Sequence, residues 1–307
     1  MTSLQPGQPF LYRQGIRAGI PRRRLATDAF QRLLPGVYIA AGAPRDAVTE
    51  ARATLLAAGP RAFLSHFQAA RLYGGVVPST EVLHASVPGQ AHRSRRPEVV
   101  VHASSRTPTT FRGLPVTSPE DTFVDLASHL SLVDLVVLGD SLVRRARTTP
   151  RRLVQASAAA PASSRRRALR AAELVRAQVD SPMETRSRLL VVLAGLPEPE
   201  VNVCFLDEHG ELRRRLDMAY RKNRLGLEYD GRQHAESQAQ WEAGVARREE
   251  FDGAGWRIIT LLAKDIYRTP AQTLDRIISA MHGAGMTVPS RLDDRWRRHF
   301  PGHRPLT

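Results

Sequence analysis

The sequence predicts an α/β chain that contains more than one domain, and three observations lead to this prediction. The chain has 307 residues, more than a single average domain needs. Hydrophobic residues make up 42 % of it, which is a globular share and excludes a fully disordered chain. Apolar residues recur with helical spacing in some stretches and alternate in others. We expect an N-terminal helix-turn-helix with a hairpin, an α+β middle region and a C-terminal domain in the order α-β-β-β-α-β-α.

Residues 1–42 have the pattern of a winged helix-turn-helix. A short helical stretch is followed by a second helix expected over 21–29, because proline suits the first helical turn. Two short apolar runs around residues 35–36 predict the hairpin. In this geometry the second helix enters the major groove of DNA, and a solvated basic helix in an interaction domain is the alternative. The candidate DNA-binding residues are Arg22, Arg23 and Arg24.

Residues 43–150 mix helical and strand signals and are predicted to form the α+β region. Ser65 is a candidate cap of a helix that ends near Gly74, and Ser118 is a candidate cap of a later one. The neighbours Ser65 and His66 lack an acid or oxyanion partner pattern, so hydrolase chemistry is not expected there. The expected helices cover 50–58, 66–75 and 118–142, and the expected strands cover 82–87 and 99–102.

The net charge is +15, and arginine supplies all but two of the 45 basic side chains. An excess of arginine favours binding to phosphates and nucleic acids. The alternative is the codon usage of a GC-rich genome, since alanine is abundant as well. Ten arginines and one acid fall in residues 144–176. Residues 151–179 are therefore predicted to be a basic helical linker, with a solvated helix face as the alternative, and residues 286–307 a basic tail.

Residues 180–285 are predicted to form the C-terminal domain. Ser181 and Glu184 have the spacing of a capping box at the start of a helix that ends at Gly195. The last strand of the domain is apolar along its whole length, which predicts a central position buried on both faces. The expected strands are 201–206, 212–220, 225–231 and 256–262, and the later helices are 236–253 and 273–281.

Carboxylates gather on one face of the second and third strands of this domain. A turn at Lys222-Asn223 places Asp217 opposite Glu228, with their Cβ atoms about 4.5–5.5 Å apart. Asp230 follows on the same face. Such a group of carboxylates is tolerable when a divalent cation binds it, and Mg²⁺ prefers oxygen ligands. The alternative is a solvent-facing acidic patch partnered by arginines.

Further candidates surround these carboxylates. His234 is a candidate for proton or phosphate handling, although a histidine after a turn is often structural. Glu184 is a candidate second acid near the metal, although its capping role alone explains it. Gly226 and Gly231 flank the carboxylates and would allow a ligand to approach the backbone closely.

Two sets of motifs resemble known families. The runs ETRSRLL, LDMAY, EYDGRQH and GWRIITLLAKDI resemble the Vsr-like branch of the PD-(D/E)XK nuclease superfamily, over residues 180–280. The runs LYRQGIRAGIPRRRL, LLPGVYIA, LSHFQAARLYG and LPVTSPEDTFVDLA resemble the AbiEi-type antitoxin domain of type IV toxin–antitoxin systems, over residues 1–150. Together the two halves resemble a common actinobacterial architecture.

The nuclease resemblance implies a role for each acid. Asp217 matches the first metal-binding acid of the superfamily, Glu228 the second, and Glu184 the acid on the first helix. Asp230 stands where the superfamily usually has a lysine. Either Asp230 joins the metal site, with His234 or an arginine supplying positive charge, or catalysis is weak. Very-short-patch-repair endonucleases also carry a structural zinc ion, which a chain with one cysteine does not match.

The sequence thus predicts a DNA-binding protein with a Mg²⁺- or Mn²⁺-dependent endonuclease domain. Asp217 and Glu228 would hold the metal, Glu184 and Asp230 would orient water, and His234 would assist proton transfer. The alternative is an AbiEi-like antitoxin or repressor whose nuclease fold only binds. DNA is the expected partner, and a cognate toxin or a repair protein is a further candidate. Without a signal peptide or an apolar membrane segment, a cytoplasmic location is expected.

Overall fold

The computed structural model describes residues 4–5, 7–89, 96–231 and 247–302. The chain divides into two compact units, each of which mixes helices and strands. The first unit comprises the residues up to Leu130 together with Arg145–Leu174. The second comprises Ser131–Arg144 together with the residues from Val175 onward. None of the helices in the described ranges combines the length and the apolar character that crossing a membrane requires.

The first unit begins with a three-stranded sheet and two short helices. The helix expected over 21–29 is a single turn, Arg22–Leu25, and the hydroxyl of Thr27 after it donates a hydrogen bond of 2.8 Å to the carbonyl of Arg24. The expected hairpin is present and has a third strand beside it, in the order β1-β3-β2. The elements are β1 (Phe10–Leu11), α1 (Tyr12–Arg17), α2 (Arg22–Leu25), β2 (Phe30–Leu34) and β3 (Val37–Ala40).

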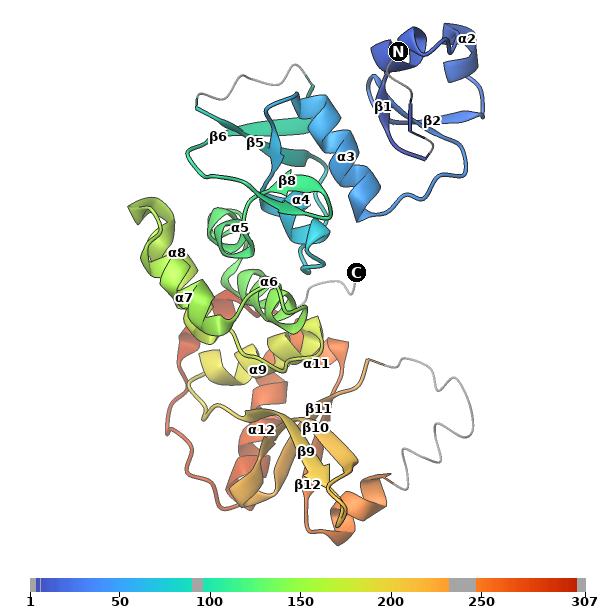
Figure 1. The fold of residues 1–307 in the computed structure, drawn as a ribbon. Helices are drawn as coiled ribbons and strands as arrows, with labels where there is room; N and C mark the ends of the chain where they lie inside the picture. The colour runs from blue at the N-terminus through green and yellow to red at the C-terminus, as the bar shows by residue number, and fades with distance from the viewer. Residues whose placement is uncertain (1–3, 6, 90–95, 232–246, 303–307) are drawn as a thin grey trace. The chain divides into compact units, whose positions relative to one another are not determined.

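A five-stranded sheet follows in the order β6-β5-β4-β8-β7, and α3 contacts strands of both sheets (Figure 1). The two strands expected in this region are present. The three additional strands are two or three residues long, too short for an alternating pattern to reveal them. The elements are α3 (Ala47–Ala58), β4 (Phe63–Leu64), α4 (His66–Leu72), β5 (Leu83–Pro88), β6 (Val99–Ser104), β7 (Thr109–Phe111), β8 (Leu114–Val116) and α5 (Pro119–Leu126).

The residues expected to form a basic linker are two helices of the first unit, α7 (Pro150–Ala158) and α8 (Ala162–Leu174). Both helices pack against α5 and against each other. Leu153 of α7 and Ala168, Ala171 and Ala172 of α8 are buried. The arginines on these helices lie on the exposed side, as expected for a solvated helix face.

The second unit contains a four-stranded sheet in the order β12-β11-β10-β9. β12 runs parallel to β11, and the other neighbours are antiparallel. The prediction that the last strand is central was wrong, because in the described part of the chain β12 pairs with β11 alone. Its side chains alternate, with Ile259 and Leu261 buried and Arg257 exposed. The strands are β9 (Glu200–Leu206), β10 (Leu212–Tyr220), β11 (Leu225–Tyr229) and β12 (Arg257–Leu261).

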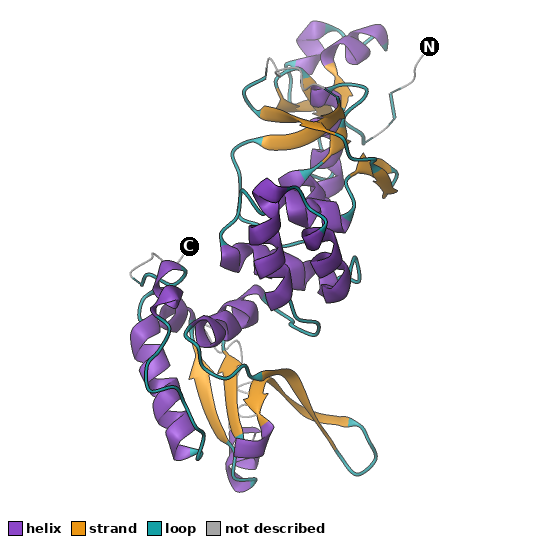
Figure 2. Cartoon of the chain, turned by 90° about the vertical axis from the view of Figure 1, so that its left-hand side faces the viewer, coloured by secondary structure: helices purple, strands orange, loops and turns teal. Residues whose placement is uncertain are grey.

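Helices pack around this sheet. The strands β9 and β10 are longer than their neighbours, and their far ends project from the sheet as a two-stranded ribbon (Figure 2). α9 contacts β10 and β11, and α12 contacts β12. A helical segment at 247–253 packs through Phe251 against Val203 and Leu216. The helices are α6 (Leu132–Arg144), α9 (Pro182–Leu193), α11 (Ala263–Tyr267), α12 (Pro270–Gly283) and the short 3-10 helices η1 (Arg221–Asn223) and η2 (Asp294–Arg298).

The residues expected to form a basic tail contact the second unit as far as the structure describes them. The backbone N–H of Asp293 donates a hydrogen bond of 2.9 Å to the carbonyl of Ala194. Trp296 of η2 is 2 % exposed. This part of the range 286–307 is therefore a packed segment of the second unit.

A buried ion pair joins α6 to α9 inside the second unit. The Arg188 side chain is 0 % exposed and lies 3.4 Å from the carboxylate of Asp140, which is 2 % exposed. The same carboxylate accepts hydrogen bonds of 2.8 Å from the backbone N–H of Arg176 and from the Thr185 hydroxyl. Arg188 also donates to Glu198 at 2.9 Å. These bonds satisfy charges that would otherwise be costly to bury.

Candidate functional site

The strand register expected for the carboxylates is present in the structure. Met218 pairs with Leu227, Ala219 with Gly226 and Tyr220 with Leu225. This is the register that follows from a turn at Lys222-Asn223. The paired residues end at Met218 and Leu227, and one further step in the same register places Asp217 opposite Glu228. At this point Oδ2 of Asp217 on β10 accepts a hydrogen bond of 2.8 Å from the backbone N–H of Tyr229 on β11, so the side chain links the two strands.

Asp217 lies at the centre of three carboxylates that come from three elements. Burial raises the pKa of Asp217, the N–H of Tyr229 lowers it, and the charges of Glu184 on α9 and Glu228 on β11 raise it further, to about 6. Arg215 lowers this pKa by a smaller amount. The structure therefore brings Asp217, Glu184 and Glu228 within electrostatic range of one another. Three neighbouring acids in a partly buried position repel one another unless a cation compensates them.

An arginine side chain already lies beside these carboxylates. Arg247, at the start of the 247–253 helical segment, binds both carboxylate oxygens of Glu228, with one of the two bonds at 3.0 Å. The same guanidinium donates a bond of 2.8 Å to the carbonyl of Arg215 on β10. A bidentate contact between arginine and a carboxylate fixes the orientation of both groups. Arg247 was not among the residues predicted from the sequence.

The remaining predicted residues have different surroundings. The Ser181 hydroxyl caps α9 as expected, accepting a hydrogen bond of 3.1 Å from the backbone N–H of Glu184. The Glu184 carboxylate accepts a bond of 2.9 Å from the backbone N–H of Asp180 and not from that of Ser181, so only half of the expected capping box forms. The partner of Asp180 is Arg215, at 2.9 Å. Asp230 directly follows β11, and its backbone N–H donates to the carbonyl of Leu261. His234 lies outside the described residues.

The donor atoms at this site suit Mg²⁺ or Mn²⁺ by their chemistry, since all of them are carboxylate oxygens. In the described ranges, however, the acids do not form a group with all ligand atoms within 4.8 Å of one another. Glu228 is also engaged by Arg247. Metal binding at Asp217 and Glu228 would therefore require the Arg247 contact to open or to shift.

The expected role of Gly226 was wrong. A Cβ atom at this position would lie 2.7 Å from Cδ1 of Ile258 and 3.0 Å from Cδ1 of Leu216. The close approach at Gly226 is therefore made by side chains of the protein core, and no room for a ligand is left there.

The candidate DNA-binding residues lie on the surface of the first unit. Arg22, Arg23 and Arg24 are exposed on α2, while Leu25 at the end of the helix is 4 % exposed and holds it to the core. No ion pair of these three guanidinium groups is found within the described ranges. They are therefore available to contact phosphates.

The structure also gathers histidines in the first unit that the sequence pattern did not connect. Ligand atoms of His66, His84 and His102 all lie within 4.8 Å of one another. This is the one group of three or more His, Cys, Asp and Glu side chains with such spacing in the described part of the chain. Ser65 is the residue before the first turn of α4, as expected, but its hydroxyl makes no capping hydrogen bond. The hydroxyl lies 2.9 Å from Nδ1 of His66 instead.

Comparison with known proteins identifies distant relatives. The chain is 28 % identical to the uncharacterized protein MT2308 of Mycobacterium tuberculosis strain CDC 1551 / Oshkosh, over 231 residues. It has the same identity over the same length to the uncharacterized protein Rv2248 of strain ATCC 25618 / H37Rv. In both cases the alignment covers 71 % of this chain and 80 % of the relative. No protein-family model matches the chain.

Proposed function

We propose that the protein binds DNA and hydrolyses its phosphodiester bonds with a divalent metal ion, Mg²⁺ or Mn²⁺, at the carboxylates of the second unit. The observation that carries this proposal is that Glu184 on α9 and Glu228 on β11 lie close enough to Asp217 on β10 for their charges to raise its pKa. The motifs that resemble the Vsr-like PD-(D/E)XK nucleases contain the same three residues. The α-β-β-β order and the parallel β12 agree with that resemblance.

The roles of the residues follow from their positions. Asp217 and Glu228 would hold the metal ion, which when bound stabilises negative charge on a phosphate and lowers the pKa of water. Glu184, in the first turn of α9, and Asp230, directly after β11, would orient water. Asp230 leaves the site without the lysine of the superfamily, and Arg247 is the arginine positioned to supply the positive charge.

A cleavage assay tests this function. The full-length protein is incubated with supercoiled plasmid and with single-stranded DNA, in the presence of Mg²⁺, Mn²⁺ or EDTA. We expect nicked or shortened products with a metal ion and none with EDTA. Intact DNA with both metals, from protein that is folded by circular dichroism, would contradict the proposal.

Replacing Arg247 by Gln separates the two effects of this cation. Metal binding should become about two- to fivefold tighter, because a half-buried ion pair of up to about 1 kcal/mol no longer competes for Glu228. Cleavage at saturating metal should become slower, since a positive charge near the phosphate is lost. Mn²⁺ titrations and single-turnover rates measure the two effects.

The matched control for Arg247 is its neighbour Arg248, whose guanidinium donates to the hydroxyl of Thr260 at 3.3 Å. Arg248→Gln is expected to leave the metal affinity unchanged. Equal metal affinity in Arg247→Gln and the wild type would mean that the contact with Glu228 does not limit metal binding.

The first unit would contribute DNA affinity through α2. Replacing Arg22, Arg23 and Arg24 together by Ala should weaken DNA binding and reduce the slope of log K against log salt by up to about 0.9 for each lost phosphate contact. Fluorescence anisotropy with a duplex oligonucleotide at several salt concentrations measures this slope. An unchanged slope would exclude contact between this helix and DNA.

A second candidate function is a regulator that binds DNA without cleaving it, similar to an AbiEi-type antitoxin or repressor. Two observations favour it: both oxygens of Glu228 are bound by Arg247, and Asp230 replaces the lysine. This function predicts sequence-selective DNA binding by the first unit and no products in the cleavage assay. The assay therefore decides between the two candidates.

A further inference from the structure

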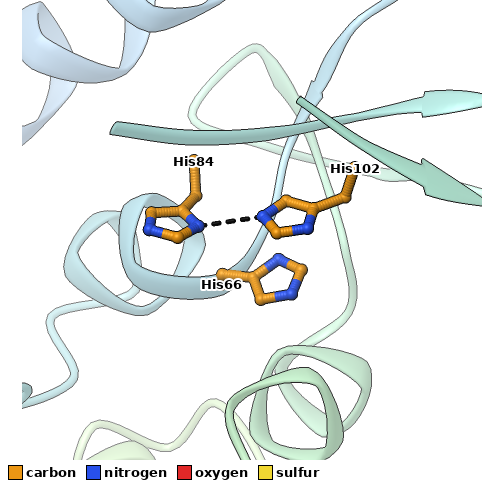
Figure 3. Close-up of side chains that lie close together, drawn as sticks. All are labelled: His66, His84 and His102. Atoms are coloured by element: carbon orange, nitrogen blue, oxygen red, sulfur yellow. Dashed lines mark hydrogen bonds between the residues drawn. The ribbon is translucent and has the colours of Figure 1, made fainter. Parts of the chain in front are cut away.

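Three histidines of the first unit meet on one side of the five-stranded sheet (Figure 3). His66 begins α4, His84 belongs to β5 and His102 to β6. The ring centroids of His66 and His102 are 3.9 Å apart, and those of His84 and His102 are 5.2 Å apart. His66 and His84 are 9 % and 6 % exposed, and His102 is partly buried.

The sheet register explains why the histidines meet. β5 and β6 run parallel, and Ser86 pairs with His102. His84 and Ser86 are two positions apart on β5, so they point to the same face of the sheet. His102 lies on that face beside Ser86, and α4 covers it with His66. The strand backbones therefore hold two of the three rings in place.

The ring nitrogens converge at a distance close to that of a metal site. Nδ1 of His84 and Nε2 of His102 are 2.9 Å apart. Two imidazole nitrogens on one tetrahedral ion, each with a bond of about 2.0–2.1 Å, are about 3.3 Å apart. If the two nitrogens moved slightly apart, an ion could bind to both of them, and its bonds would replace the hydrogen bond between them.

The surroundings of His66 are those of an oriented ligand. Nδ1 of His66 lies 2.9 Å from the hydroxyl of Ser65, and the hydroxyl of Ser86 donates to Ser65 at 2.8 Å. Histidines that bind metals usually have their other ring nitrogen fixed in this way by a neighbouring group. His66 also has a φ of +52°, a backbone conformation that residues other than glycine adopt only with strain.

The chemistry of the group indicates the class of metal. All three ligands are imidazoles, which suit Zn²⁺, Cu²⁺, Ni²⁺ and Co²⁺ rather than Mg²⁺. Burial, and to a smaller extent the neighbouring imidazoles, lowers the pKa of His66 to about 2 and that of His84 to about 4. The ring of His129 lies beside them, with its centroid 5.0 Å from that of His66.

We propose that His66, His84 and His102 form a binding site for a transition-metal ion of the Zn²⁺ class. Three protein ligands leave a coordination position open, as in sites where a metal ion binds water or a substrate group. His129 is exposed, and its ring lies edge-on to that of His66. This site is independent of the carboxylates of the second unit, since it shares no residue with them.

The test uses the full-length chain purified without a histidine tag and treated with a chelator. Co²⁺ is added and followed by visible absorption, and Zn²⁺ is then added as a competitor. We expect a single tight equivalent of Co²⁺ with the absorption bands of a nitrogen-ligated ion, displaced by Zn²⁺ and unaffected by excess Mg²⁺. A chain that takes up no Co²⁺ under these conditions would overturn the proposal.

Variants locate the site. His102→Gln should abolish the absorption bands, and Ser65→Ala should weaken Co²⁺ binding by about 10–100-fold through loss of the group that orients His66. Ser65→Ala is expected to fold, because its hydroxyl makes no capping bond. Bands of wild-type strength in His102→Gln would overturn the assignment.

Two controls exclude other ligands. His209→Gln changes an exposed histidine of the second unit, and Asp217→Asn combined with Glu228→Gln changes the carboxylate site. Both proteins should bind Co²⁺ like the wild type. If His102→Gln does not fold, long-range ¹H–¹⁵N spectra of the wild-type histidine rings decide. Zn²⁺ must shift the signals of His66, His84 and His102, and unshifted signals would overturn the proposal.

Discussion

Replacing Asp217 by Asn is expected to lower the rate of metal-dependent DNA cleavage by about 10²–10⁴-fold, the loss that corresponds to several kcal/mol of stabilisation from a metal ion. Asn keeps the shape of the side chain and an oxygen that accepts the bond from the N–H of Tyr229. It removes the charge that Glu184 and Glu228 repel. The fold should therefore remain at least as stable as that of the wild type.

The control for this prediction is Glu208→Gln, which removes an equal charge from an exposed turn of the same unit. Its rate should match that of the wild type. If Asp217→Asn and Glu208→Gln cleave plasmid DNA equally fast, Asp217 is not a metal ligand of the reaction.

Replacing Asp140 by Ala is expected to destabilise the second unit by about 3–5 kcal/mol. The change leaves the guanidinium of Arg188, which is 0 % exposed, without the carboxylate of Asp140 and with that of Glu198. It also removes the acceptor of the Thr185 hydroxyl and of the Arg176 backbone N–H. Urea unfolding measures the loss.

Tryptophan fluorescence makes this measurement specific, because all three tryptophans of the chain come after residue 175. The matched control is Glu200→Ala, which breaks an ion pair with Arg221 whose side chains are 57 % and 49 % exposed. An exposed pair contributes about 0–1 kcal/mol. Equal destabilisation by the two changes would show that the buried ion pair contributes no more to stability than the exposed one.

Local patterns were sufficient to predict the parts of the structure that depend on neighbours along the chain. The turn at Lys222-Asn223 set the register of β10 and β11, and therefore the approach of Asp217 to Glu228. The cap at Ser181 and the alternation along β10 were equally local. The predicted positions needed no information about the rest of the fold.

Contacts between distant parts of the chain could not be predicted in this way. Arg247 reaches Glu228 from a helical segment that the sequence pattern places but does not orient. The histidines at 66, 84 and 102 meet because α4 packs against β5 and β6 runs parallel to β5, and parallel pairing has no local signal. The edge position of β12 likewise depends on which strands pair with it, and the pattern of its own residues does not show this.

The most direct test of the central claim is Mn²⁺ binding by the carboxylates of the second unit, measured by the EPR signal of the free ion. Mn²⁺ is suited to this test because it favours carboxylate over imidazole ligands. The account predicts that the wild type binds Mn²⁺ and that Asp217→Asn combined with Glu228→Gln does not. Equal binding by both proteins, or none by the wild type, would contradict it.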